Sequence, residues 1–233
     1  MLWLVASLNS PHPDLTMPFS PEWDALFRAG RNVGEWPWSD VVSLVYRYAK
    51  PSDGYRRVLE LGPGNGANIP LFLALGAEYH AVEGSAFVVA HLHERFPQLA
   101  EHIVAGDFTR EIPFTGPFDL VVDRASITHN TTEAIRPTLA LVRNVLRPGG
   151  KMIGVDWFAA DHSAASTGTS LDSHTRISCH GTFEGVGAVH FSDRSHLLEL
   201  LAGAELSIEY LAHKQVTSVD ERMCSWNFVS ASI

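Results

Sequence analysis

Between residues 57 and 158 the apolar positions follow two spacings in turn. Short runs of neighbouring apolar residues, typical of buried strands, alternate with longer segments in which apolar residues recur every three or four positions, typical of helices. The short runs predict strands at 57–60, 79–82, 103–104, 118–122 and 152–158. Strands that alternate with helices form βαβ units, so the pattern predicts a parallel sheet with helices on both faces.

The longer segments predict helices between these strands, at 67–75, at 85–96 and from near Arg136 to Leu146. We place the start of the third helix at Arg136 because Pro137 is tolerated in the first turn of a helix and disrupts its interior. The chain after residue 191 predicts one more helix and two β-rich runs, at 192–201, 206–212 and 223–231. A polar turn separates the two runs, which predicts an antiparallel pair at the end of the sheet.

Three segments lie outside this alternation. Residues 9–21 carry four prolines, so we expect 1–21 to form an extended arm, with Met17 as the physiological start. Residues 22–50 contain two amphipathic helical runs around a glycine-containing break. Residues 161–191 are rich in Ser, Thr, Gly and His and show no regular pattern. Because a long loop inside a compact domain is usually functional or mobile, we interpret 161–191 as an insertion that faces the substrate.

Composition narrows the class of protein and its partners. The chain has 233 residues, of which 45% are hydrophobic and 18% charged, enough for one globular domain with a substantial core. With 17 Lys and Arg against 26 Asp and Glu, the net charge is −9, which disfavours nucleic acid as a partner. No stretch approaches the roughly 20 apolar residues of a membrane span, so we expect no membrane partner. Two cysteines exclude a disulfide framework and favour a reducing, cytoplasmic location.

A glycine-rich turn, Glu60-Leu-Gly-Pro-Gly-Asn-Gly-Ala67, joins the first expected strand to the first expected helix. Glycines in such a turn let the backbone bend sharply and let a ligand approach without meeting a Cβ. In an open parallel sheet, ligands bind beyond the carboxyl ends of the strands, where Glu83 can accept hydrogen bonds from the hydroxyls of a ribose. The turn also satisfies the spacing of a dinucleotide site, so the glycines alone leave NAD and S-adenosylmethionine open.

Glu60 distinguishes these two cofactors. It precedes Gly62 by two residues, which places its carboxylate at the mouth of the turn. A dinucleotide would bring its pyrophosphate close to this carboxylate, and like charges in a partly desolvated site repel each other strongly. S-adenosylmethionine has no phosphate and carries an ammonium and a sulfonium, so a carboxylate favours it. A solvated charge at the end of a strand is the alternative interpretation of Glu60.

Together these segments resemble class I S-adenosylmethionine-dependent methyltransferases. Residues 58–66 resemble motif I of this family, and four further segments follow in the family's order, at 81–83, 106–108, 118–123 and 146–151. The resemblance implies a doubly wound α/β, Rossmann-like methyltransferase fold, with a mostly parallel seven-stranded sheet whose last strand is antiparallel. It also implies S-adenosylmethionine as the cofactor and S-adenosylhomocysteine as the product.

The resemblance implies which residues bind the methionine and ribose parts of the cofactor. Glu60, Gly62 and Gly64 would line the methionine moiety. Glu83 would hold the ribose, with a plain strand-end charge as the alternative. In this superfamily the segment before the sheet often folds over the cofactor as a lid, and Trp36 would suit the methyl-sulfonium through cation–π attraction. A role as a core anchor is the alternative for Trp36.

Three more positions match the family's motifs. Asp107 would face the adenine amino group, and Phe108 would cover the adenine ring. The alternative for Asp107 is a turn-forming residue. Asp123 would face the methionyl end through its backbone or support the acceptor, and the alternative is a capping residue.

His129 is the candidate catalytic base. Methyl transfer is an in-line displacement, for which the enzyme chiefly aligns a nucleophile behind the methyl carbon in a dry pocket. A hydroxyl acceptor also loses a proton as it attacks, which suits a histidine. His129 follows the fourth expected strand, on the rim where an acceptor would lie; a histidine bound only to local backbone is the alternative. The insertion holds four more histidines, but no spacing typical of a metal site, so we expect no metal.

These observations predict an S-adenosylmethionine-dependent methyltransferase that acts on a small molecule. By elimination, we expect the acceptor to be a hydroxyl of a sugar, of a glycan precursor or of a secondary metabolite. A protein or peptide methyltransferase, a non-catalytic cofactor-binding subunit and an NAD(P)-dependent oxidoreductase are the alternatives. We expect a monomer or homodimer, with 22–50 as a helical lid segment and 51–233 as the catalytic domain that binds the cofactor.

Overall fold

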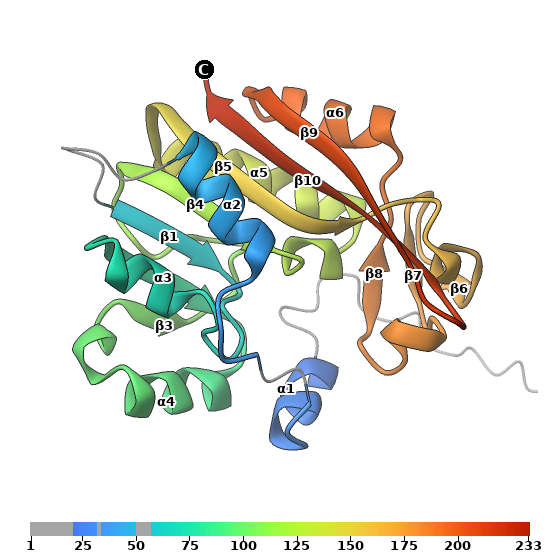
Figure 1. Ribbon diagram of the computed structural model, residues 1–233, viewed down its shortest axis with the longest axis horizontal. Helices are drawn as coiled ribbons and strands as arrows, with labels where there is room; N and C mark the ends of the chain where they lie inside the picture. Colours follow the sequence, from blue (N-terminus) through green and yellow to red (C-terminus); the bar gives the residue numbers. More distant parts are fainter. Residues whose placement is uncertain (1–20, 32–33, 50–56) are drawn as a thin grey trace, which may run out of the picture.

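A seven-stranded sheet runs through the centre of the protein (Figure 1). The computed structural model describes residues 21–31, 34–49 and 57–233, so residues 1–20 of the expected arm, Met17 among them, lie outside the described residues. The strand order is β3-β2-β1-β4-β5-β10-β9. In this order the strands span Ile103–Ala105, Glu78–Glu83, Arg57–Leu61, Phe118–Arg124, Leu146–Phe158, Arg222–Ser232 and Leu206–Thr217.

The strand directions confirm the predicted sheet. Neighbours from β3 to β5 pair in parallel, while β10 is antiparallel to both β5 and β9. Neighbouring residues of a strand point to opposite faces: Val58 and Leu120 belong to the core on one face, and Leu59 and Val121 to the core on the other. All four are fully buried, which explains why these strands are continuous apolar runs in the sequence.

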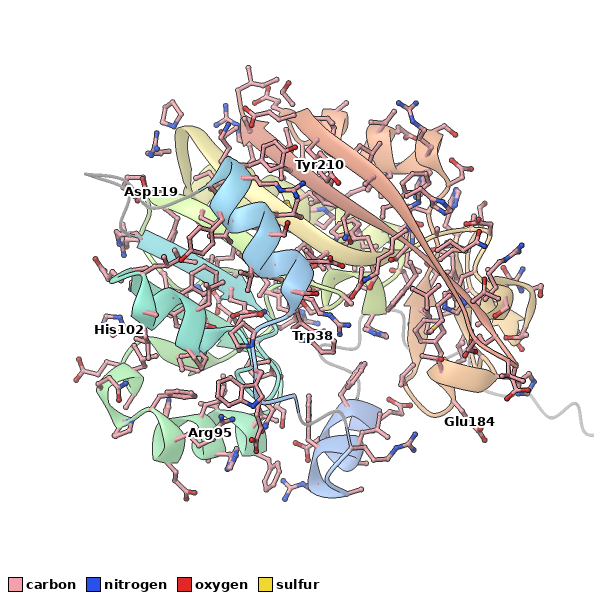
Figure 2. The ribbon with its side chains drawn as sticks, viewed as in Figure 1. Trp38, Arg95, His102, Asp119, Glu184 and Tyr210 are labelled. Atoms are coloured by element: carbon pink, nitrogen blue, oxygen red, sulfur yellow. The ribbon has the colours of Figure 1, made fainter. Side chains whose placement is uncertain are left out.

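Helices cover both faces of the sheet. On one face lie α2 (Ser39–Tyr48), α3 (Ile69–Ala74) and α4 (Ala86–Arg95); on the other lie α5 (Thr132–Val145) and α6 (Arg194–Gly203). The end of α2 reaches the edge of the sheet, because Tyr48 packs against Tyr210 of β9 with ring centroids 5.1 Å apart (Figure 2). None of the helices in the described part of the chain is long and apolar enough to span a membrane.

Helix α5 begins earlier in the chain than the position of Pro137 predicts. The helix begins at Thr132 instead of near Arg136, and Pro137 lies inside it. The Thr131 Oγ1 accepts a hydrogen bond from the Ala134 N–H at 3.3 Å, so a capped first turn forms before the proline. Pro137 removes one bond to the carbonyl of Glu133, which is an exposed residue whose carbonyl water can reach. The cap therefore decides where the helix begins.

The expected loop at 161–191 has regular structure of its own. It contains a three-stranded antiparallel sheet and two short 3₁₀ helices: β6 (Thr169–Ser170), β7 (Thr175–Ile177), β8 (Ala188–His190), η3 (Ser163–Ser166) and η4 (Gly181–Phe183). Strands of two or three residues are too short to show an alternating pattern, so the sequence does not reveal them. The Asp172 carboxylate accepts hydrogen bonds from N and Oγ1 of Thr132 at 3.0 and 3.1 Å, which joins the insertion to α5.

The first described helix, α1 (Pro21–Arg28), lies between α4 and the small sheet of the insertion (Figure 1). Its Asp24 Oδ1 accepts a hydrogen bond from the Ser85 Oγ at 2.6 Å, and Ser85 is the N-cap of α4. On the other side, Leu26 belongs to an apolar cluster with Phe183 and Val189 of the insertion. Helix α1 is therefore held by two segments that are far from it in the sequence.

Candidate active site

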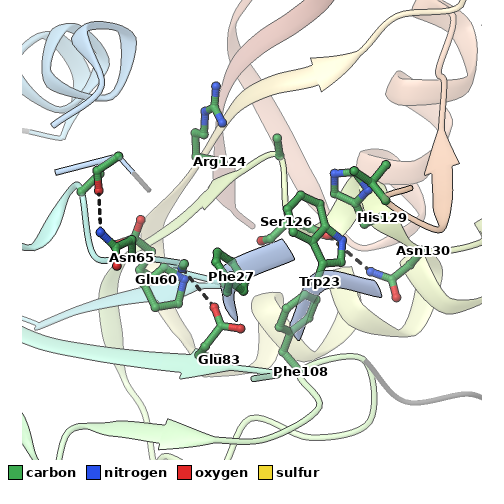
Figure 3. Close-up of a pocket in the computed structure, with 18 of the residues that line it drawn as sticks. Trp23, Phe27, Glu60, Asn65, Glu83, Phe108, Arg124, Ser126, His129 and Asn130 are labelled. Atoms are coloured by element: carbon green, nitrogen blue, oxygen red, sulfur yellow. Dashed lines mark hydrogen bonds between the residues drawn. The ribbon is translucent and has the colours of Figure 1, made fainter. Parts of the chain in front are cut away.

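A cavity of about 600 Å³ opens where the first four strands end (Figure 3). Its wall includes the residue that follows each of the strands β1 to β4, namely Gly62, Gly84, Gly106 and Ala125. Helix α1 and the insertion supply further parts of the wall. The cavity thus occupies the place where open parallel sheets bind their ligands.

The glycine turn approaches the end of β4 closely. Gly62 has φ +61°, and a Cβ at this position would lie 2.4 Å from the Cβ of Ser126. Gly64 has φ +51°, and its N–H donates a hydrogen bond to Glu83 Oε2 at 3.0 Å. Both positions need glycine, the first because no side chain fits and both because the backbone is left-handed. Both predicted glycines line the cavity.

Glu60 is a buried part of the cavity wall, with 2% of its surface exposed. Its Oε1 accepts a hydrogen bond from Asn68 Nδ2 at 2.8 Å, and its Oε2 accepts one from the Tyr79 hydroxyl at 2.6 Å. Burial raises the pKa of Glu60 to about 7. This burial excludes a solvated strand-end charge. Each carboxylate oxygen has a second lone pair, so Glu60 can still bind a cation in the cavity.

Glu83 ends β2 and also lines the cavity. Its Oε2 accepts from the Gly64 N–H, and its Oε1 accepts from the Ser85 N–H at 2.9 Å. Burial raises the pKa of Glu83 above its ordinary value. The carboxylate is thus oriented by backbone donors from two turns, at the end of β2 beside the cavity.

Asp107 and Phe108 follow β3 and line the same cavity. The Asp107 Oδ1 accepts hydrogen bonds from N and Oγ1 of Thr109 at 2.9 and 2.6 Å, and its Oδ2 lies 3.3 Å from Arg110 Nε. The Phe108 ring packs against the core on the face of the sheet that α5 covers. Asp107 therefore has the contacts of a turn-forming residue as well as a place in the cavity, so both interpretations remain compatible with the geometry.

The side chain of Asp123 is enclosed, so the expected contact of this residue with the methionyl end through its backbone stays a prediction. Asp123 has no exposed surface and is not part of the cavity wall. Its carboxylate accepts hydrogen bonds from the Ile127 N–H at 3.0 Å, from Trp157 Nε1 at 2.6 Å and from the Ser126 hydroxyl. Burial raises the pKa of Asp123 to about 6. The side chain caps the turn after β4, as in the alternative interpretation. Its carboxylate oxygens accept hydrogen bonds from groups within the protein and do not line the cavity.

The predicted lid residue Trp36 does not reach the cavity. Its surface is 81% exposed, whereas Trp38, two residues later, lines the cavity. The Trp38 N–H donates to Asn68 Oδ1 at 3.1 Å, and its ring stacks on the Arg124 guanidinium at 3.7 Å from the ring centroid. These contacts fix Trp38 at the start of α2 and leave Trp36 on the surface.

His129 lies in the short helix η2 (Ile127–His129) and lines the cavity on the side opposite Glu60 and Glu83 (Figure 3). Its Nδ1 is 3.0 Å from the carbonyl oxygen of Ala188, in the insertion. A carbonyl accepts only, so Nδ1 carries the proton and Nε2 carries the lone pair. Burial lowers the pKa of His129 to about 4. The imidazole is therefore neutral near physiological pH.

The cavity also has aromatic walls that the sequence did not assign to it. Trp23, Phe27, Phe158 and Phe183 all line the cavity. Trp23 and Phe27 are four residues apart in an amphipathic segment, which predicts a helix packed on a core. Phe158 ends an expected strand, and Phe183 lies in the segment without a pattern. Only tertiary packing brings these rings together, so no local signal could have identified them.

Within the described ranges, one group of three side chains has the geometry of possible metal ligands: Asp161, His213 and Cys224. Their ligand atoms lie within 4.8 Å of one another, and His213 Nε2 is 3.0 Å from Asp161 Oδ1. Two of the three are exposed, and the observed hydrogen bond accounts for the approach of the imidazole. The sequence-based expectation that no metal is required stays a prediction.

Comparison with known proteins finds a matching domain family and several solved structures with the same fold. Residues 58–150 match the family model described as a methyltransferase domain. No curated protein matches the sequence significantly. Among solved structures, a SAM-dependent methyltransferase from Methanosarcina mazei is 13% identical, with 85% of this chain and 99% of that one covered and a TM-score of 0.67. The 1,6-didemethyltoxoflavin N1-methyltransferase of Burkholderia thailandensis is 20% identical, with 98% and 93% covered and a TM-score of 0.65.

A third solved structure, the CcbJ methyltransferase of Streptomyces caelestis, is 17% identical, with 85% of this chain and 100% of that one covered and a TM-score of 0.61. Residues 58–150 therefore carry a methyltransferase domain, and the protein shares its fold with solved S-adenosylmethionine-dependent methyltransferases. Five segments that resemble motifs of the class I S-adenosylmethionine-dependent methyltransferases follow in order along the first five strands, most of them inside this domain.

Proposed function

We propose that this methyltransferase transfers the methyl group of S-adenosylmethionine to a hydroxyl of a small molecule, with His129 as the base. One observation carries the proposal: Glu60, Glu83, Phe108 and His129 line a single cavity. Glu60, Glu83 and Phe108 surround the glycine turn, and His129 lies across the cavity from it. A methyl donor and its acceptor therefore have adjacent binding regions.

The cofactor side of the cavity suits each part of S-adenosylmethionine. The Glu60 carboxylate would bind the ammonium, whose charge compensates for the burial of the carboxylate. The Glu83 carboxylate would accept hydrogen bonds from the ribose hydroxyls. Phe108 would cover the adenine ring beside Asp107. When bound, the cofactor supplies a methyl group already activated by its sulfonium, so the protein chiefly has to align the acceptor.

His129 would remove the acceptor's proton. The hydrogen bond to Ala188 fixes the tautomer, so that Nε2 is the basic nitrogen. A pKa of about 4 keeps the imidazole neutral and able to accept a proton, although it is a weak base. Proton transfer is therefore expected to accompany bond formation, when the attacking oxygen becomes far more acidic.

A small-molecule acceptor is supported by the size of the cavity, since about 600 Å³ lies within the range of roughly 300–1,000 Å³ of small-molecule sites. The Burkholderia thailandensis neighbour was solved with 1,6-didemethyltoxoflavin and S-adenosylhomocysteine bound. A sugar, a glycan precursor or a secondary metabolite fits this size. A cytoplasmic location belongs to the same proposal and is supported by two free, buried cysteines.

Isothermal titration with S-adenosylhomocysteine and with NADH tests the cofactor assignment. We expect S-adenosylhomocysteine to bind with micromolar affinity and NADH not to bind. Glu83→Ala should weaken S-adenosylhomocysteine binding by about 1–3 kcal/mol through lost charge-assisted hydrogen bonds. Glu78→Ala, on the same strand but 46% exposed at its side chain, is the matched control and should bind normally. Tight NADH binding, or unchanged affinity in Glu83→Ala, would contradict the assignment.

A further inference from the structure

The half of the cavity around His129 is lined by aromatic rings from four separate segments. We call this half the acceptor chamber and define it by Trp23, His129, Phe158 and Phe183, which belong to α1, η2, β5 and η4. The ring centroids of Trp23 and His129 are 4.7 Å apart, those of His129 and Phe158 5.5 Å, and those of Phe158 and Phe183 4.5 Å. The four rings therefore form a continuous wall.

The arrangement of these rings favours a flat ligand. Consecutive rings are inclined by 73°, 70° and 62°, so each presents an edge to the face of the next. A planar ring placed against such a wall can make stacked and edge-to-face contacts at once. Behind the wall, Phe158 and Phe183 pack on an apolar cluster that includes Phe191. This packing holds the chamber in shape without a ligand.

The polar side chains near the chamber already use hydrogen-bond donors within the protein. The Thr182 hydroxyl donates to Glu221 Oε2, and the Asn130 Nδ2 donates to the Ile127 carbonyl at 3.1 Å. A sugar carries a hydroxyl on almost every carbon, and most of these would lose their hydrogen bonds to water without replacement. An aromatic ring loses few hydrogen bonds to water when it enters the same chamber. The wall therefore favours an aromatic acceptor over a sugar.

Arg124 brings a guanidinium to one side of the chamber. Its Nη2 donates to Asp156 Oδ2 at 2.9 Å, its guanidinium stacks on Trp38, and its Nε is buried without a partner among the described residues. The carboxylates in the cavity wall all lie on the cofactor side: Glu60, Glu83 and Asp107. Because Asp156 pairs with Arg124 from the adjoining cavity, this side of the chamber offers a guanidinium with hydrogen-bond donors rather than an unbalanced positive charge, which suits an oxygen of the acceptor.

A second cavity of about 270 Å³ adjoins the chamber and shares Arg124, Phe158 and Phe183 with it. Its wall also contains Lys214, whose Nζ lies 2.6 Å from Asp40 Oδ2 and 3.2 Å from Asp156 Oδ1. The space beyond Arg124 can thus hold a substituent of a ring bound in the chamber, next to groups that are already oriented by ion pairs.

We propose that the acceptor is a planar aromatic or heteroaromatic compound with an ionisable hydroxyl and a second oxygen, carbonyl or carboxylate, that Arg124 binds. The inference rests on the proposed function, because it names the acceptor class for the same reaction. The hydroxyl faces His129. As the bond between its oxygen and the methyl carbon forms, the bond between sulfur and that carbon breaks, S-adenosylhomocysteine leaves as a neutral thioether, and the hydroxyl proton passes to His129 Nε2 and then to solvent.

Matched probes test this acceptor class on the full chain saturated with S-adenosylhomocysteine. The aromatic probe is 2-hydroxybenzoate and its saturated partner is 2-hydroxycyclohexanecarboxylate; glucose and N,N-dimethylglycine represent the sugar and amine classes. Titrations followed by NMR should give about 10-fold tighter binding of the aromatic probe than of its saturated partner, because only the former stacks. Equal affinities, no binding of the aromatic probe, or preferential binding of glucose or N,N-dimethylglycine would overturn the proposal.

Variants of the chamber residues then test whether the aromatic probe binds in the chamber. Trp23→Leu and Phe183→Leu should each weaken 2-hydroxybenzoate binding by about 3- to 10-fold, through lost ring contacts. Arg124→Met should remove the preference for 2-hydroxybenzoate over phenol. Tyr46→Leu is the matched control, since Tyr46 is 49% exposed and not part of either cavity wall, and it should bind the probe normally. Unchanged binding in both ring variants would also overturn the proposal.

The affinity for S-adenosylhomocysteine, measured in the same samples, separates the two proposals. If S-adenosylhomocysteine does not bind, the proposed function fails. If it binds and the aromatic probe is not preferred over its saturated partner, the acceptor class alone is wrong and the methyltransferase assignment stands.

Discussion

At the scale of single residues, two ionisable groups face each other across the cavity with pKa values displaced by the same cause. Burial raises the pKa of Glu60 to about 7 and lowers that of His129 to about 4. In both cases the charged form is disfavoured. Glu60 needs a cation to become fully ionised at neutral pH, whereas the neutral form of His129 is the one that its proposed role as a general base requires.

The raised pKa of Glu60 predicts that cofactor binding depends on pH. Below about pH 7 the free protein holds a proton on Glu60, which the ammonium of the ligand must displace. Affinity for S-adenosylhomocysteine should therefore fall as the pH drops below 7, approaching about tenfold per pH unit, and level off above it. Titrations near pH 6 and pH 8 measure this. Glu60→Gln should bind more weakly and lose the pH dependence; equal affinities of the unaltered protein at both pH values would contradict the role of Glu60.

With an identified acceptor, replacement of His129 by Gln should lower turnover by about 100- to 10,000-fold, which is the usual contribution of a general base. S-adenosylhomocysteine affinity should stay within about twofold, because His129 lies across the cavity from the cofactor side. His91→Gln, an exposed change on α4, is the control and should be fully active. Full activity of His129→Gln would remove His129 as the base, and a parallel loss of cofactor affinity would indicate a structural role.

Sequence could predict the residues that adjoin strand ends but not those that need a tertiary partner. Glu60 and Glu83 lie two residues and one residue before a glycine at the end of an apolar strand, so their position beside the cavity follows from the strand pattern. The sequence gives no reason to choose between Trp36 and Trp38 as the residue that lines the cavity, because they are identical and only two positions apart. What separates them is the hydrogen bond from the Trp38 N–H to Asn68 and the stacking on Arg124, and no local rule contains either contact.

At the scale of elements, helix α5 shows how two local signals compete. Pro137 favours a helix start at Arg136, just before it, and the Thr131 cap favours a start at Thr132, four residues earlier. The cap prevails because a satisfied first turn adds hydrogen bonds, whereas Pro137 removes only one, near an exposed carbonyl. The strands of the main sheet, by contrast, are predictable because burial on both faces makes them long apolar runs.

Removal of the cap tests this competition. Thr131→Ala should lower the free energy of unfolding by about 1 kcal/mol, because the Ala134 N–H loses its acceptor. Urea denaturation measures the change. Thr131→Ser keeps a capping hydroxyl and should be close to the unaltered protein. If Thr131→Ala is as stable as Thr131→Ser, the cap does not set the start of α5.

At the scale of the whole molecule, one carboxylate ties the insertion to the main domain. Besides the two hydrogen bonds from Thr132, Asp172 Oδ1 accepts from the N–H groups of His174 and Thr175, each at 2.8 Å. The insertion in turn supplies Phe183 and the carbonyl that binds His129. The position of the acceptor chamber therefore depends on a contact outside it.

Asp172→Ala should raise the acceptor KM several-fold and leave S-adenosylhomocysteine affinity unchanged, because the loss loosens the insertion and not the glycine turn. Steady-state kinetics and titration give the two values. Asp220→Ala, an exposed change in the turn between β9 and β10, is the control and should alter neither. An unchanged acceptor KM in Asp172→Ala would show that the insertion is held in place without this contact.

The division of the cavity between two parts of the chain bears on how this protein diverged from its relatives. The residues expected to bind the cofactor, other than the lid, lie within the stretch 58–150 that matches the methyltransferase domain. Three of the four acceptor-chamber rings, Trp23, Phe158 and Phe183, lie outside it. Under the proposed division, a change of acceptor would need altered flanking segments only, so likeness confined to 58–150 would carry little information about what a related enzyme methylates.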